Sequence, residues 1–153
     1  MSLQDRMKSL LSFALLLTVA SAYAGPEVPP DLPIPVASFG AAGLPDGSLY
    51  FYGGHSGKRH NYNRDEVHGD FFRWKPGMSS WETLAKDEPS QGASLVVSGR
   101  GLIRIGGMAA RNEKGGDEDL WSSETASVYD MKSNQWTPLP NLPERRSSHD
   151  SIV

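Results

Sequence analysis

Short apolar runs alternate with turn residues along most of the chain, from about residue 36 to the end. Two of the turns, Asp46-Gly47 and Ser98-Gly99, carry the glycine that favours a tight β-hairpin. Runs of four to six residues between such turns are typical of short antiparallel strands. The pattern predicts eight strands, at Ser38–Ala42, Ser48–Tyr52, Gly69–Trp74, Ser80–Leu84, Ala93–Val97, Leu102–Ile105, Ala126–Tyr129 and Gln135–Pro138.

The chain contains an internal repeat, which becomes visible when its two Gly-Gly pairs are aligned. Residues 46–54 then match residues 99–107, because each segment has a turn, a strand-like run and two glycines. An aromatic residue and a tryptophan, with six residues between them, follow each pair as Trp74 with Trp81 and as Tyr129 with Trp136. Two units of about 50 residues therefore follow one another, with two extra residues in the second.

This pattern resembles the kelch repeat, whose units are propeller blades of four antiparallel strands. The second unit is the better match, and the first departs from the family pattern by having Trp74 where tyrosine is usual. The resemblance implies an all-β fold, a kelch-type β-propeller fragment of about two four-stranded antiparallel blades plus the first strand of a third. The residues that carry the structural repeat motif are Gly53, Gly54, Trp74, Trp81, Gly106, Gly107, Tyr129 and Trp136.

The repeat divides the chain into consecutive segments. We expect a signal peptide over residues 1–24, a proline-rich lead-in over 25–35, a first kelch unit over 36–92, a second over 93–145 and the start of a truncated third over 146–153. Propellers need about four to eight blades to close. We therefore expect a fragment of a longer propeller whose terminal apolar faces are exposed. A short protein that closes the ring with several copies is the alternative.

The N-terminal residues have the three-part layout of a secretory signal peptide. Arg6 and Lys8 form a short basic start, and the run from Leu10 to Ala20 is almost wholly apolar. Ala22-Tyr23-Ala24 offers small residues at the positions that signal peptidase requires, which predicts cleavage after Ala24. A membrane-spanning helix needs about 20 apolar residues. We therefore expect a secreted or periplasmic protein without a membrane span once the signal is removed.

Composition excludes several classes of protein. The 16 glycines and 11 prolines disfavour long helices. The absence of cysteine excludes disulfides, thiolate metal sites and a cysteine nucleophile in this chain. A formal net charge of −3 makes nucleic acid a poor partner, because phosphate binding needs a basic face. Neither a cofactor nor a bound metal is predicted.

Two long polar loops follow the double glycines, at His55–His68 and Met108–Glu124, and the resemblance implies that they share one face. They are either a ligand surface or solvated loops whose polar residues cap turns. The spacing of His55, His60 and His68 matches no tight metal-binding pattern. Ser148, His149 and Asp150 are adjacent, so a strand would turn them to alternating faces and prevent a catalytic triad. The candidate ligand-binding residues are His55, Arg59, His60, Tyr62, Arg64, Arg111 and Trp121.

We therefore expect an exported kelch-repeat binding module that recognises a protein or a carbohydrate through its long loops. The alternative is a periplasmic kelch enzyme, similar to the kelch proteins that interconvert sialic acid anomers. An enzyme would need acid–base groups converging on the loop face. No motif identifies such groups, so the sequence assigns no catalytic residue.

Overall fold

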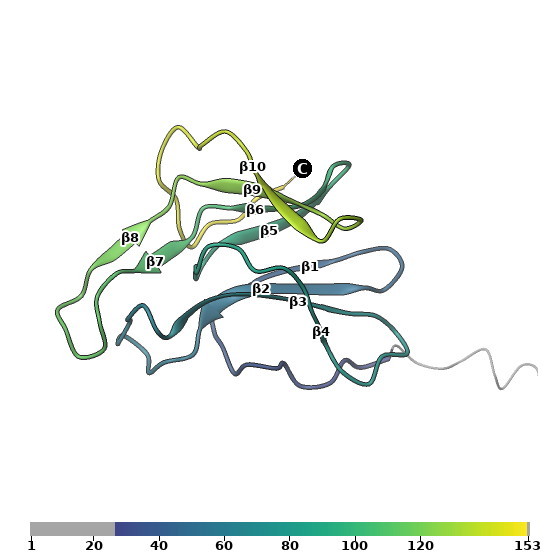
Figure 1. Ribbon diagram of the computed structural model, residues 1–153, viewed down its shortest axis with the longest axis horizontal. Coiled ribbons are helices and arrows are strands. Elements are labelled where there is room, and N and C mark those ends of the chain that lie inside the picture. Colours follow the sequence, from purple (N-terminus) through teal and green to yellow (C-terminus); the bar gives the residue numbers. More distant parts are fainter. Residues whose placement is uncertain (1–26, 153) are drawn as a thin grey trace, which may run out of the picture.

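The computed structural model describes residues 27–152, so the predicted signal peptide lies outside the described residues. The described part is built from antiparallel strands and has no helix. Figure 1 shows two sheets stacked as layers, with a small ribbon at one end. No helix that could span a membrane occurs in residues 27–152.

Each of the two sheets has four strands that follow the two repeat units. The first sheet has the order β1 (Gly40–Gly43), β2 (Leu49–His55), β3 (Val67–Trp74) and β4 (Glu82–Thr83). The second has the order β5 (Ser94–Ser98), β6 (Gly101–Ile105), β9 (Ala126–Asp130) and β10 (Gln135–Pro138). The all-β prediction and all eight predicted strands are confirmed, with ends displaced by up to three residues.

Two details differ from the sequence prediction. Strand β2 does not end at Tyr52 but continues through the double glycine to His55, with a bulge between Tyr52 and Gly54. The second long loop is also more regular than predicted. It contains the ribbon of β7 (Met108–Ala110) and β8 (Leu120–Ser122). These strands were missed because each is only three residues long and nine polar and glycine-rich positions separate them.

Aromatic side chains fill the space between the two sheets. The alternation of side chains along each strand turns Tyr52 and Phe71 of the first sheet towards Leu102 and Tyr129 of the second. The rings of Phe71 and Tyr129 lie 4.8 Å apart at 78°, an edge-to-face contact. Trp136 packs beside them, 5.2 Å from Tyr129. The aromatic residues of the second unit therefore form the contact with the first.

The double glycines form the same tight corner in both units. Gly53 and Gly106 have φ of 65° and 59°, in the left-handed region that favours glycine. The N–H of Gly54 donates to the carbonyl of Ser90 at 2.8 Å. In the second unit the N–H of Gly107 donates to the carbonyl of Arg146 at 2.9 Å. Each corner thus binds the backbone at which the next unit begins.

The segment after Arg146 begins as a third unit would. The N–H of Gly92 donates to Ser38 O at 2.6 Å, and the N–H of Ser148 donates to Gly92 O at 2.8 Å. All three residues have positive φ, between 53° and 60°. The predicted first strand of the third unit is nevertheless absent from residues 147–152. The reason is that β1 pairs with β2 and β5 with β6, whereas no second strand lies beside this segment in the described residues.

The described part of the proline-rich lead-in, residues 27–35, lies on the outer face of the first sheet. The indole N–H of Trp81 donates to Pro30 O at 3.0 Å, as the indole of Trp136 donates to Ala85 O at 2.8 Å one unit later. Phe51 and Phe72 on this face are buried. The apolar face at this end is therefore largely covered, although Phe39 beside Phe51 stays 41% exposed.

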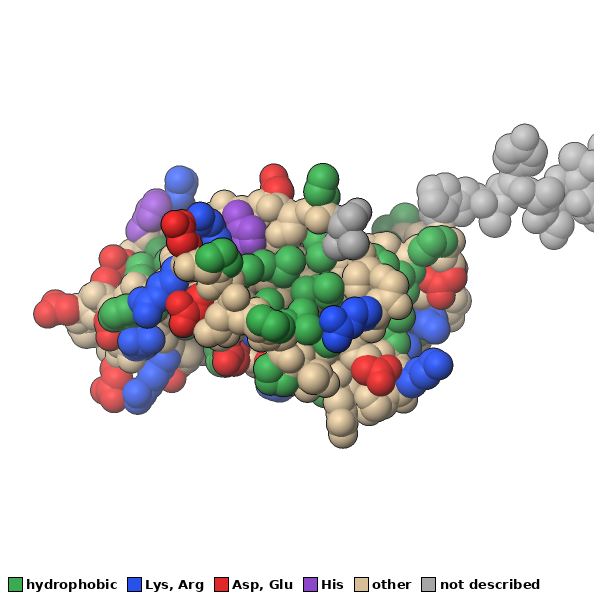
Figure 2. Space-filling model, turned by 90° about the horizontal axis from the view of Figure 1, so that it is seen from above, with side chains coloured by type: hydrophobic (Ala, Val, Ile, Leu, Met, Phe, Trp, Pro, Cys, Tyr) green, Lys and Arg blue, Asp and Glu red, His purple; other side chains and the backbone are tan. Residues whose placement is uncertain are grey.

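Within residues 27–152, no further sheet covers the outer face of the second sheet. Val96, Ile103 and Val128 are cross-strand neighbours on the face that points away from Leu102 and Tyr129. Figure 2 looks onto this side of the molecule and shows hydrophobic side chains across its centre.

Gly53→Ala tests the tight corner. A Cβ on Gly53 would lie 2.3 Å from the carbonyl oxygen of Ser90, and the residue would also keep a positive φ of 65°. We expect a loss of about 3 kcal/mol in the free energy of unfolding, measured by urea denaturation. The matched control is Gly77→Ala, which has φ of 90° but no atom within 4 Å of the added Cβ. It should lose only about 1 kcal/mol, and equal losses would contradict the close contact.

Candidate functional site

The long loops lie at one end of the two sheets. Figure 1 shows the β2–β3 loop, the β7–β8 ribbon and the connections after β4 and β10 at the left, with the short hairpin turns at the right. Figure 2 shows charged side chains concentrated towards the same end. This end is called the loop face below.

Direct contacts join the β2–β3 loop to the β7–β8 ribbon. The N–H of Arg64 donates to Asn112 O at 3.0 Å, and the side-chain amide of Asn112 donates to Tyr62 O at 2.8 Å. The Arg64 guanidinium also lies 2.8 Å from Glu113. Exposed ion pairs contribute little stability, but hydrogen bonds to backbone atoms fix the relative position of the loops. The two loops therefore form one layer.

Glu66 adds a second link to this layer. Its carboxylate accepts from Lys114 at 3.2 Å and from the Asn63 amide at 2.6 Å. The hydrogen bond from Lys114, with help from Asn63, holds the pKa of Glu66 below its usual value despite partial desolvation. The carboxylate therefore stays ionised and keeps the cross-link at neutral pH.

His55 lies at the base of this layer, although the sequence predicted it as a ligand residue. Its side chain is 5% exposed, and its ring packs edge-on against Tyr62 at 4.7 Å. Its Nε2 atom lies 4.0 Å from Glu66 and has no hydrogen-bond partner among the described residues. His55 therefore supports the β2–β3 loop from below.

Of the other ligand residues predicted in this loop, Arg59, His60 and Arg64 are exposed, whereas Tyr62 is half-buried. His60 contacts Tyr62 with a ring separation of 6.5 Å and is exposed, as is Arg59. His68 belongs to β3 and is bonded to Ser56 at 2.7 Å. No group of three or more metal-ligating side chains is brought together within residues 27–152.

A groove runs beneath the layer, between the ribbon and the connections from β4 to β5 and from β8 to β9. It consists of two adjoining cavities of about 260 and 240 Å³, which share Glu88, Ala109 and Ser123. Arg64 and Arg104 line the first cavity. Two further arginines, Arg111 and Arg145, line the second cavity together with the exposed indole of Trp121. We call this the loop-face groove.

Arg104 is a fully buried cation at the floor of the groove. Its guanidinium bonds Asp87 at 2.8 Å, Thr125 at 3.0 Å and Ser127 at 3.2 Å. A buried guanidinium needs such partners, because an unpaired charge would be costly to desolvate. Tyr52 donates from its hydroxyl to the carbonyl of Glu88, next to Asp87. The connection that forms this side of the groove is therefore fixed to the core of both sheets.

Trp121 is the exposed aromatic residue of the groove. The Arg111 guanidinium lies over its ring at 4.2 Å and the Arg145 guanidinium at 4.7 Å. Such cation–π contacts hold a guanidinium plane in place. Arg145 comes from the connection after β10, so the cluster joins two separate segments of the chain.

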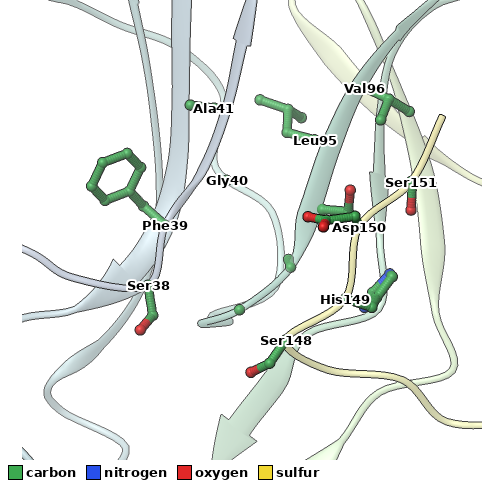
Figure 3. Close-up of a pocket in the computed structure, with 13 residues that line it drawn as sticks. Ser38, Phe39, Gly40, Ala41, Leu95, Val96, Ser148, His149, Asp150 and Ser151 are labelled. Atoms are coloured by element: carbon green, nitrogen blue, oxygen red, sulfur yellow. The ribbon is translucent and has the colours of Figure 1, made fainter.

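A third cavity of about 470 Å³ lies between β1, β5 and residues 148–151. Figure 3 shows Ser38, Ser148 and Asp150 around it, with the His149 ring and the Asp150 side chain on opposite sides of the backbone. Neither ring nitrogen of His149 has a hydrogen-bond partner in the described residues. These residues do not form a catalytic triad.

Comparisons with known proteins agree with this architecture. The model of the Kelch motif family matches residues 40–88, which span β1 to β4. A putative F-box/kelch-repeat protein of Arabidopsis thaliana is 28% identical over an alignment of 123 residues, and the match covers 76% of this chain and 33% of the relative. The solved structure of YjhT has a TM-score of 0.62 at 20% identity and matches 83% of this chain and 34% of its own.

The chain contains a Kelch motif at residues 40–88 and is similar to a kelch-repeat protein. It spans about a third of the length of the relative and of the solved structure that it matches. The likeness to YjhT shows the fold alone.

The repeat pattern predicted that the long loops share one face, but it did not predict the groove beneath them. The structure places three of the predicted ligand residues at the groove or its rim, namely Arg64, Arg111 and Trp121. Sequence reasoning missed Arg104 and Arg145. Arg104 could have been found, because a charged residue inside the apolar run Leu102–Ile105 indicates a buried ion pair. No signal near Arg145 pointed to Trp121, because the two positions are 24 apart in the sequence and only the fold brings them together.

Proposed function

We propose that this chain is an exported kelch-repeat interaction module that holds a protein partner in the loop-face groove. The observation that supports this most directly is the cross-linked layer of the β2–β3 loop and the β7–β8 ribbon. Solvated loops do not need hydrogen bonds to each other's backbone, whereas a binding surface gains from being rigid before the partner arrives. Kelch repeats commonly serve in protein interactions, which agrees with this use.

The side chains of the groove suit a protein partner better than a sugar. Tryptophan and arginine are the residue types most enriched at the energetic centres of protein interfaces. Sugars usually stack on an open aromatic ring, but two guanidinium groups occupy the ring of Trp121. A carbohydrate is therefore the second candidate ligand.

The enzymatic alternative has less support from the groove. Its carboxylates, Glu88 and Glu124, line the cavity beside Arg111 and Arg145. Glu88 is 61% exposed and already accepts a hydrogen bond from Thr125. A general acid or base usually lies in a desolvated position, whereas the Glu124 side chain is also 45% exposed.

Asn112→Asp tests the proposed function. The change replaces the amide that donates to Tyr62 O with a carboxylate that repels it, which should separate the two loops. Peptides selected from a random linear library against the wild-type chain should bind this variant at least about tenfold more weakly, by fluorescence anisotropy. Asn61→Asp makes the same change in charge at an exposed position of the β2–β3 loop and should keep the wild-type affinity.

Two results would count against the interaction module. One is a selection that yields no peptide specific for the folded chain. The other is peptides that bind the wild type, Asn112→Asp and Asn61→Asp equally, because binding would then not depend on the layer.

Export is proposed from the sequence of residues 1–24. Expressed in a bacterium, the chain should enter the periplasm with Gly25 as its first residue, shown by N-terminal sequencing. Leu16→Arg places a charge inside the apolar run and should leave the uncleaved chain in the cytoplasm. The control Ser2→Arg adds the same charge to the basic start and should be exported. A wild-type chain that stays uncleaved in the cytoplasm would refute the proposal.

A further inference from the structure

The side chains of the loop-face groove also indicate which chemical group of the partner it binds. We propose that the cavity around Arg111, Trp121 and Arg145 binds one acidic side chain, aspartate or glutamate, of an extended segment of a protein partner. This inference rests on the proposed function, because it names the ligand class of the same groove.

The ribbon holds Arg111 and Trp121 together. Strands β7 and β8 pair so that Ala109 lies opposite Trp121 and Ala110 opposite Leu120. The N–H of Arg111 then donates to Asp119 O at 2.9 Å and extends the ladder by one residue. The Trp121 indole N–H is bonded to the Asp119 carboxylate, which fixes the orientation of the ring. The position of Arg111 over the ring is therefore set by backbone pairing and by the fixed ring.

The charged end of Arg111 is unused. In the described part of the chain, its guanidinium has no hydrogen-bond partner and no carboxylate within 4.0 Å. The other arginines that line the groove differ, because Arg64 is paired with Glu113 and Arg104 with Asp87 at 2.8 Å. Arg145 has only a loose contact of 3.9 Å to Glu124. The donors of Arg111 are therefore available to a ligand.

A guanidinium that stacks on an indole presents its N–H groups at the edge of its plane. A carboxylate can accept two parallel hydrogen bonds from that edge, which is the strongest geometry for this pair. The ring also restricts the motion of the arginine, so less conformational entropy is lost when the ligand binds. A cavity of about 240 Å³ accommodates a single side chain rather than a folded domain.

The carboxylates of the groove limit the ligand to an isolated negative charge. Glu88 and Glu124 line the same cavity as Arg111 and Arg145. A second acidic group on the ligand would meet these carboxylates and be repelled. The formal net charge of the chain, −3, also opposes polyanions. The balance of charges favours one acidic residue flanked by neutral or basic ones over a phosphate-rich or polyacidic ligand.

The test is a comparison of selections from a random linear peptide library. Wild-type chain should enrich peptides with aspartate or glutamate at one shared position, and changing that residue to asparagine or glutamine should weaken binding at least about tenfold. Arg111→Met keeps the length of the side chain without its charge and should enrich no acidic position. Arg111→Lys keeps the charge without the planar fork and should bind the wild-type peptides with intermediate affinity.

The matched control is Arg100→Met, which removes an exposed arginine from the β5–β6 turn, at the opposite end of the sheet. It should retain both the acidic position and the wild-type affinity. Matching near-UV circular dichroism spectra establish that all variants share the wild-type fold.

The other outcomes separate this inference from the proposed function. Peptides that need the loop layer but share no acidic position, or that bind Arg111→Met as well as wild type, would overturn the acidic-side-chain site and leave the interaction module standing. Binding of glucuronic acid that depends on Arg111, without any acidic peptide, would overturn it in favour of an acidic sugar. Failure of the selection as a whole would refute the interaction module itself.

Discussion

The close approach of backbone to backbone at the double glycines is the contact on which the rest of this structure depends. At Gly53 and Gly106 an added Cβ would lie 2.3 and 2.6 Å from the carbonyl oxygens of Ser90 and Arg146. Only glycine allows this approach at a positive φ. The neighbouring amide then donates to the same carbonyl, so each unit is fixed to the start of the next. The stacking of the sheets and the aromatic core between them follow from that spacing.

The location of the groove follows from the same corners. Ser90 accepts the hydrogen bond from Gly54 and also lines the groove, and Ala109 lies two residues after Gly107. The loops that leave the corners must therefore meet above the point where the first unit passes into the second. Because the corner fixes their bases, a few hydrogen bonds between the loops suffice to hold them as a layer. A rigid scaffold that positions variable loops is a common basis for binding sites.

The sequence predicted the sheets well and the site only in part. Strand positions and the kelch repeat could be predicted because alternation, turn glycines and the aromatic spacing are local properties. The β7–β8 ribbon could not, because its short strands become stable only when they pair with each other. His55 looked like a surface ligand, but the continuation of β2 past the glycines buries it. The pairing of Trp121 with Arg145 depends on tertiary structure, and nothing local to either residue predicts it.

The most direct test is the rate of amide hydrogen exchange at Gly54 and Gly107, measured residue by residue by NMR. Both N–H groups donate to the carbonyl that opens the next unit, so we expect strong and similar protection, comparable with amides in the centre of β2 and β6. The exposed turn glycine Gly115 provides the unprotected reference. Exchange of either corner amide at the rate of Gly115 would show that the units are not joined in this way and would contradict the account.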